Sequence, residues 1–152
     1  MNRSASSLWA AKRFFSLPLE EKRLLIQAFM LLWAIRIGLW VLPFSTLRGI
    51  IQKITPIITD GGENNLIPLD RLVWATEVMS CYVPKATCLT KALAGKVLLA
   101  RAGYSSSLFI GVAKNEENNF EAHAWLNRDE LTIIGKSDRD FKELLSLSEQ
   151  DL

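Results

Sequence analysis

The spacing of apolar residues predicts helices in the first half of the chain. Residues 8–15 carry a short apolar stripe, and residues 18–42 repeat apolar side chains at intervals of three and four, which is the period of an amphipathic α-helix. Apolar side chains also occupy a second side of this long helix, so it is expected to be covered on more than one face. A shorter helix is expected at 44–53.

The clearest linker lies within residues 55–68, where Gly and Asn gather. It divides the chain into a predicted helical N-terminal region, residues 1–68, and a second region, residues 69–152. The second region opens with a predicted helix at 71–82, for which Asp70 is a suitable N-cap residue.

A further helix is predicted at residues 88–102, with Thr87 as its N-cap and Gly103 as its C-cap. Its apolar residues fall on one face. Its basic residues are expected to point outward: Lys91, Lys96 and Arg101.

After Gly103 the period changes from helical to extended. Strands are predicted at 108–113, 120–127 and 131–134, whereas residues 140–152 have a weakly helical or irregular pattern. In the second strand, alternation places His123 on the side opposite Ala122 and Ala124. The fold class expected is therefore α+β.

Composition and charge exclude several classes of function. A net charge of +2 does not favour a nucleic-acid partner, and no basic block is interleaved with aromatic residues. Two cysteines and one histidine fit neither a disulfide scaffold nor a zinc site, and they suit a reduced, cytoplasmic compartment. The chain has no Walker-type glycine loop. We therefore expect no metal, no nucleotide and no other cofactor.

The long helix also raises the question of a membrane. Residues 24–44 are long enough to span a bilayer, but Arg36 near their middle would cost roughly 2.5–3.5 kcal/mol on insertion. The N-terminus lacks the pattern of a secretory signal. Packing in the core, docking of a partner or contact with a membrane surface are therefore favoured over a transmembrane span.

Cys88 is the residue with the clearest chemical role. A thiol in the first turn of a helix meets the positive end of the helix dipole, which favours the thiolate. His123, the only histidine, lies 35 residues further on and suits the role of proton acceptor. The competing interpretation is structural, because lone cysteines and histidines often only pack. Cys81 stands near the end of a helix and is interpreted as structural.

Several segments resemble the lasso-peptide leader peptidases, which are transglutaminase-like cysteine proteases. The peptidases form one half of the microcin-type maturation B protein or a separate chain in its split form. The resemblance rests on Thr87-Cys88-Leu89, on Ala122-His123-Ala124-Trp125 and on their surroundings, and it extends to the N-terminal helices. The similar segments are residues 13–25, 42–44, 82–93, 98–103, 108–112 and 122–125.

The resemblance implies a papain/transglutaminase-like core, with a catalytic helix packed on a small antiparallel sheet, and a Cys–His–Asp site. Cys88 would be the nucleophile and His123 the base. Relatives place the aspartate on the next strand, and that position falls at or near Gly135. Asp138 is our first choice for the third member; the other options are Asp129, Asp140 or a backbone carbonyl.

The resemblance also implies partners: a precursor peptide with leader and core, a separate leader-binding chain, and the lasso cyclase. Residues 24–42 are the stretch expected to dock a partner. Two other functions fit the pattern. One is acyl transfer, as in transglutaminases, on the same thiol. The other is a protein without catalytic activity that binds a membrane or a partner through its apolar helix.

Overall fold

The computed structural model describes residues 17–55, 67–114, 119–137 and 141–147, with only the backbone at 145–147. The helix predicted at 8–15 and most of the predicted linker lie outside the described residues.

Four helices form the first part of the described structure. Three of them begin directly after a proline, whose fixed φ suits entry into a helix. Their bounds are Leu19–Val41 (α2), Phe44–Ile54 (α3), Leu69–Ser80 (α4) and Cys88–Arg101 (α5). These helices were predicted, but the cap assigned to Asp70 is wrong: Pro68 holds that position and makes no side-chain cap, so Asp70 lies in the first turn.

Four strands follow and form one antiparallel sheet in the order β3-β2-β1-β4. They span Ser107–Lys114 (β1), Phe120–Arg128 (β2), Leu131–Ile134 (β3) and Lys142–Leu147 (β4). The prediction of a helical or irregular tail is wrong at β4, which pairs with the open edge of β1. Leu144 and Leu145 are adjacent, so the period of two that identifies a half-buried strand is missing there.

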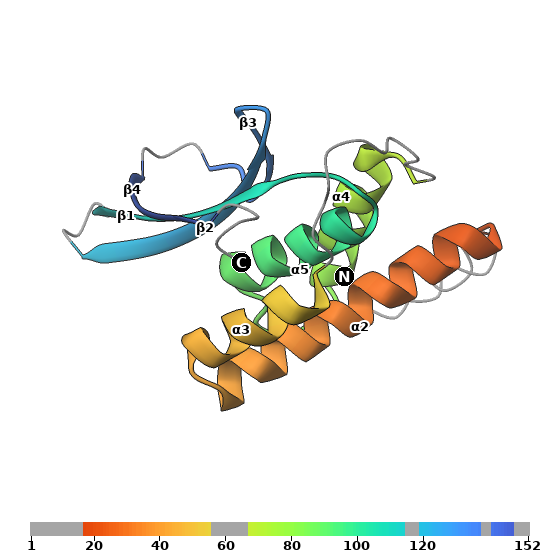
Figure 1. Cartoon of the computed structure of the whole chain (residues 1–152), viewed down its shortest axis with the longest axis horizontal. Helices are drawn as coiled ribbons and strands as arrows, with labels where there is room; N and C mark the ends of the chain where they lie inside the picture. The colour runs from red at the N-terminus through yellow and green to blue at the C-terminus, as the bar shows by residue number, and fades with distance from the viewer. Residues whose placement is uncertain (1–16, 56–66, 115–118, 138–140, 148–152) are drawn as a thin grey trace, which may run out of the picture.

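Helix α5 occupies the middle of the molecule, with α2 and α3 on one side and the sheet on the other (Figure 1). Its residues from Ala92 to Ala100 are all buried. The outward orientation predicted for Lys96 is wrong, because this side chain is only 1% exposed and its Nζ donates to the Ser106 carbonyl at 2.6 Å. The architecture is α+β, as predicted: a central helix packed on a small antiparallel sheet.

Candidate functional site

Cys88 is the first residue of α5, and the preceding Thr87 caps the helix as predicted. The Thr87 hydroxyl oxygen accepts a hydrogen bond from the Thr90 backbone N–H at 3.3 Å and lies 3.0 Å from the Thr90 hydroxyl. Cys88 itself is half-buried against the core. Within the described part of the chain, the backbone N–H groups of Cys88 and Leu89 donate to no acceptor. The helix start therefore offers a thiol beside two available hydrogen-bond donors.

His123 lies in the middle of β2, opposite Gly111 of β1. Its Nε2 is 2.7 Å from the Gly135 carbonyl oxygen. A carbonyl can only accept a hydrogen bond, so Nε2 carries the hydrogen and, in the neutral ring, Nδ1 keeps its lone pair. The bond thus selects the tautomer in which Nδ1 can accept a proton.

Aromatic side chains surround the imidazole. Phe141 stacks on it at 4.9 Å between centroids, and Trp125 lies 6.1 Å away in a nearly parallel plane. Trp125 stacks in turn on Phe109 of β1 at 5.8 Å. The imidazole is therefore one of four aromatic rings that lie against one another, from Phe109, His123, Trp125 and Phe141. No sequence signal marks Phe141, which follows a polar stretch and precedes a strand that was not predicted.

Gly135 combines two properties that explain the residue type. Its φ is +79°, and a Cβ built on it would lie 2.8 Å from the Ala124 carbonyl oxygen. A side chain there would therefore strain the backbone and push against β2. The same residue supplies the carbonyl that holds His123, and it lies at or near the position for which the resemblance implies an aspartate.

We expect Gly135→Ala to lower stability by about 1–3 kcal/mol and to lower activity beyond that loss, because the carbonyl that orients His123 moves. Urea unfolding and turnover at a temperature where the variant is fully folded would separate the two effects. A suitable control is Gly49→Ala in α3, where an added Cβ meets nothing within 4 Å. Full turnover in folded Gly135→Ala would contradict the orienting role.

Helix α5 packs on β2, and the amino end of α5 lies toward the amino-terminal half of that strand (Figure 1). A Cβ on Gly95 would lie 3.5 Å from the Leu126 side chain, which fixes one contact between the two elements. Cys88 is about 10 Å before Gly95 along the helix, and His123 is about 10 Å before Leu126 along the strand. The two elements run in the same direction (Figure 1). From the contact between Gly95 and Leu126, Cys88 and His123 therefore both lie toward the amino end of the helix.

The side chains of β2 divide between two faces. Ala124 and Leu126 are buried on the face that packs on α5, whereas alternation assigns His123 and Trp125 to the other set. No hydrogen bond joins the Cys88 thiol to the imidazole in the described structure. The two elements are thus brought together, while a direct pairing of Cys88 with His123 stays a prediction.

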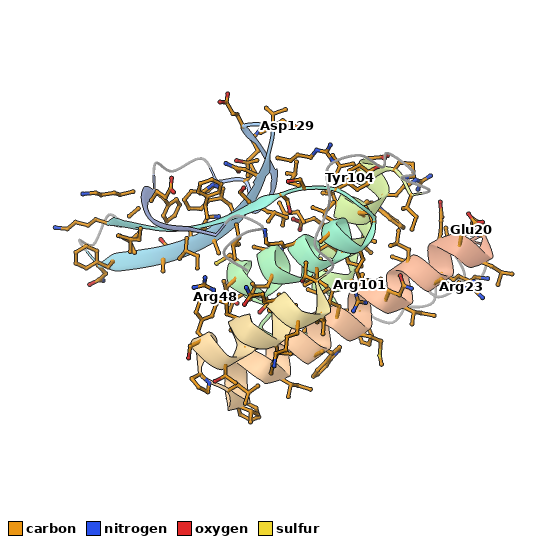
Figure 2. All side chains as sticks on the ribbon, viewed as in Figure 1. Glu20, Arg23, Arg48, Arg101, Tyr104 and Asp129 are labelled. Atoms are coloured by element: carbon orange, nitrogen blue, oxygen red, sulfur yellow. The ribbon has the colours of Figure 1, made fainter. Side chains whose placement is uncertain are left out.

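The structure describes only some of the groups predicted as the third member of the site. Asp138 and Asp140 lie outside the described residues. Asp129 is in the turn between β2 and β3, far out at the tip of the hairpin (Figure 2), where it pairs with the Arg128 Nε at 3.2 Å and is 83% exposed. Of the alternatives raised by the sequence, a backbone carbonyl is the group that bonds His123 among the described residues.

Two further expectations concern the other thiol and metals. Cys81 is exposed at the end of α4, and its Sγ lies 3.5 Å from the Glu77 carbonyl oxygen, while its structural role stays a prediction. The described residues include no cluster of three or more His, Cys, Asp or Glu side chains that could hold a metal ion.

Comparison with known proteins places this arrangement in a family. No curated protein and no solved structure matches the chain. The family model described as the transglutaminase-like superfamily matches residues 29–146, which include α5 and the whole described sheet except the last residue of β4. The superfamily typically uses a catalytic cysteine, and here Cys88 opens the central helix. The chain therefore belongs to the transglutaminase-like superfamily.

Proposed function

We propose that this protein is a cysteine peptidase that removes the leader from a ribosomally made, lasso-type precursor peptide. The observation that carries the proposal is that a helix with a half-buried thiol at its capped start packs on the strand whose histidine has its Nε2 2.7 Å from a carbonyl oxygen. Membership of the superfamily supports thiol chemistry, and the sequence resemblance supports the substrate.

In the proposed reaction, His123 Nδ1 accepts the thiol proton and the Cys88 sulfur attacks the carbonyl carbon of the leader–core bond. The oxyanion that forms accepts hydrogen bonds from the free N–H groups at the start of α5, those of Cys88 and Leu89. The imidazolium then gives its proton to the leaving amine of the core. Water, activated by His123, cleaves the thioester and releases the leader as a carboxylate.

This mechanism requires Cys88 Sγ and His123 Nδ1 to meet in the complex with substrate. Alternation assigns His123 to the face of β2 that does not pack on α5, so the proposal requires the imidazole to move toward the start of α5 when substrate binds. The bond from Nε2 to Gly135 supports the proposal because it leaves Nδ1 unprotonated in the neutral ring. It also replaces the orienting role that a carboxylate has in a Cys–His–Asp site.

The proposed partners are the precursor peptide, a separate chain that recognises the leader, and the lasso cyclase that consumes the released core. Hydrolysis frees the amino group of the core, and a cyclase that forms a macrolactam needs a free amine.

The experiment that tests the proposal distinguishes hydrolysis from acyl transfer. The protein, a leader–core peptide and the leader-binding chain are incubated in water enriched in oxygen-18, with a primary amine present, and the products are weighed by mass spectrometry. We expect the leader carboxylate to gain one heavy oxygen. A leader joined to the amine would assign the protein to the acyltransferases, and an intact precursor would contradict both.

A further inference from the structure

Helix α2 has two apolar faces, and the core covers only one of them. The covered face packs toward α4 and α5 through five side chains that are at most 4% exposed: Leu24, Leu25, Ala28, Leu32 and Ile35. The other face is a stripe of seven apolar side chains that lie within an arc of roughly 100°. We call this the outer stripe: Leu19, Ile26, Met30, Trp33, Ile37, Trp40 and Val41.

The outer stripe is larger than a soluble monomer usually exposes. The exposed fraction reaches 84% at Trp40, 65% at Met30 and 51% at Ile37. Together the seven side chains leave on the order of 900 Å² uncovered, whereas the largest apolar patch on a typical monomer is about 300–600 Å². A patch of this size indicates a partner or a membrane.

The charged residues of α2 indicate which kind of molecule covers the outer stripe. Arg23 and Arg36 lie at the two borders of the stripe, and Arg23 points away from the core (Figure 2). The two acids of α2, Glu20 and Glu21, lie outside the arc of the stripe, and Glu21 is paired with Arg71 of α4 at 3.2 Å. Two copies of the same basic face would repel each other, so the charge favours an anionic occupant.

The chemistry of the stripe favours lipid over a folded protein. Interfaces between proteins have about one hydrogen bond per 100–200 Å², and the stripe offers only the indole N–H groups of Trp33 and Trp40. Tryptophan beside arginine is typical of residues at a bilayer interface. Within the described chain, α2 is also the one helix long and apolar enough to cross a membrane.

We propose that the outer stripe of α2 lies on the surface of an anionic lipid bilayer. The helix rests on the membrane and does not cross it, because crossing would remove Leu32 and its neighbours from the core. The sheet with the candidate site is on the opposite side of α5 (Figure 1), so it stays in water and open to a soluble substrate. This inference is independent of the proposed peptidase activity.

The test is co-sedimentation of the full chain with unilamellar vesicles of phosphatidylcholine alone or mixed equally with phosphatidylglycerol. We expect binding to the anionic vesicles, a blue shift of tryptophan fluorescence, and weaker binding in high salt. The single variant Ile37→Glu should weaken partitioning to the vesicles more than tenfold. The double variant that carries both Arg23→Glu and Arg36→Glu should do the same. Leu131→Glu, at a 71% exposed position on the sheet, is the matched control and should bind as the wild type does.

Three results would overturn the proposal. The first is absence of binding to anionic vesicles. The second is a discrete dimer in vesicle-free solution that Ile37→Glu dissociates, which would assign the stripe to a second copy. The third is saturable binding of the leader-binding chain that Ile37→Glu abolishes, without vesicle binding. Peptide cleavage in vesicle-free solution should be unchanged in Ile37→Glu, so failure here and failure of the proposed function can be told apart.

Discussion

Replacing Cys88 by alanine is expected to reduce leader cleavage by at least roughly 10³-fold, because removing a nucleophile leaves only substrate positioning and the oxyanion donors. The fold should survive, since Cys88 is half-buried and alanine is a good helix former. Cleavage is followed by mass spectrometry with the leader-binding chain present, and circular dichroism checks the folded fraction. Undiminished cleavage by Cys88→Ala would contradict the assignment.

Cys81 provides the matched control. It is the other cysteine of the chain and lies exposed at the end of α4. Cys81→Ala should cleave like the wild type, which separates loss of the nucleophile from loss of any thiol. It also yields a protein whose only thiol is Cys88, so alkylation reports on that sulfur alone.

His123→Ala is expected to slow cleavage by about 10²–10⁴-fold as a general base and acid is lost. Because the thiol and the imidazole are not hydrogen bonded in the structure, cleavage alone would not prove that they act as a pair. In the Cys81→Ala background, His123→Ala should also slow alkylation of Cys88 by iodoacetamide at neutral pH. If alkylation were unchanged while cleavage fell, His123 would act on the substrate or on the fold, and not on the thiol.

Local signals made the start of α5 predictable. A threonine before an apolar repeat identifies an N-cap, and the cap and the helix were both found at the predicted residues. Lys96 was not predictable in the same way, because its burial depends on the Ser106 carbonyl ten residues away. Helical periodicity assigned Lys96 to solvent, and tertiary packing overrode that assignment.

The orientation of His123 shows where sequence reasoning reaches its limit. The period of two predicts a strand around His123, and the resemblance implies a carboxylate as its first-choice partner, with a backbone carbonyl among the alternatives. The group that bonds it is the carbonyl of Gly135, and a carbonyl is present at every residue, so no residue type marks it. The positive φ of Gly135 and the close approach of the Ala124 carbonyl are the features with a sequence correlate, since both favour glycine.

Helix α2 leads to the prediction with the largest effect on stability. Leu32 is fully buried, and it belongs to a hydrophobic cluster shared by the helices and the sheet. We expect Leu32→Ala to lower the free energy of unfolding by about 2–5 kcal/mol. For a chain of this size, that loss should lower Tm by roughly 5–15 °C. Urea and thermal unfolding monitored by circular dichroism measure both quantities.

Met30 is the control on the same helix, because it is 65% exposed and, like Leu32, loses a large apolar side chain on replacement by alanine. Met30→Ala should change stability by no more than about 0.5 kcal/mol.

The unfolding of Leu32→Ala and Met30→Ala also tests the predicted division of the chain at residues 68/69. Since α2 packs into the same cluster as α5, we expect a single cooperative transition, which Leu32→Ala moves as a whole. Two transitions, with Leu32→Ala moving only one of them, would instead make residues 1–68 a unit that folds separately.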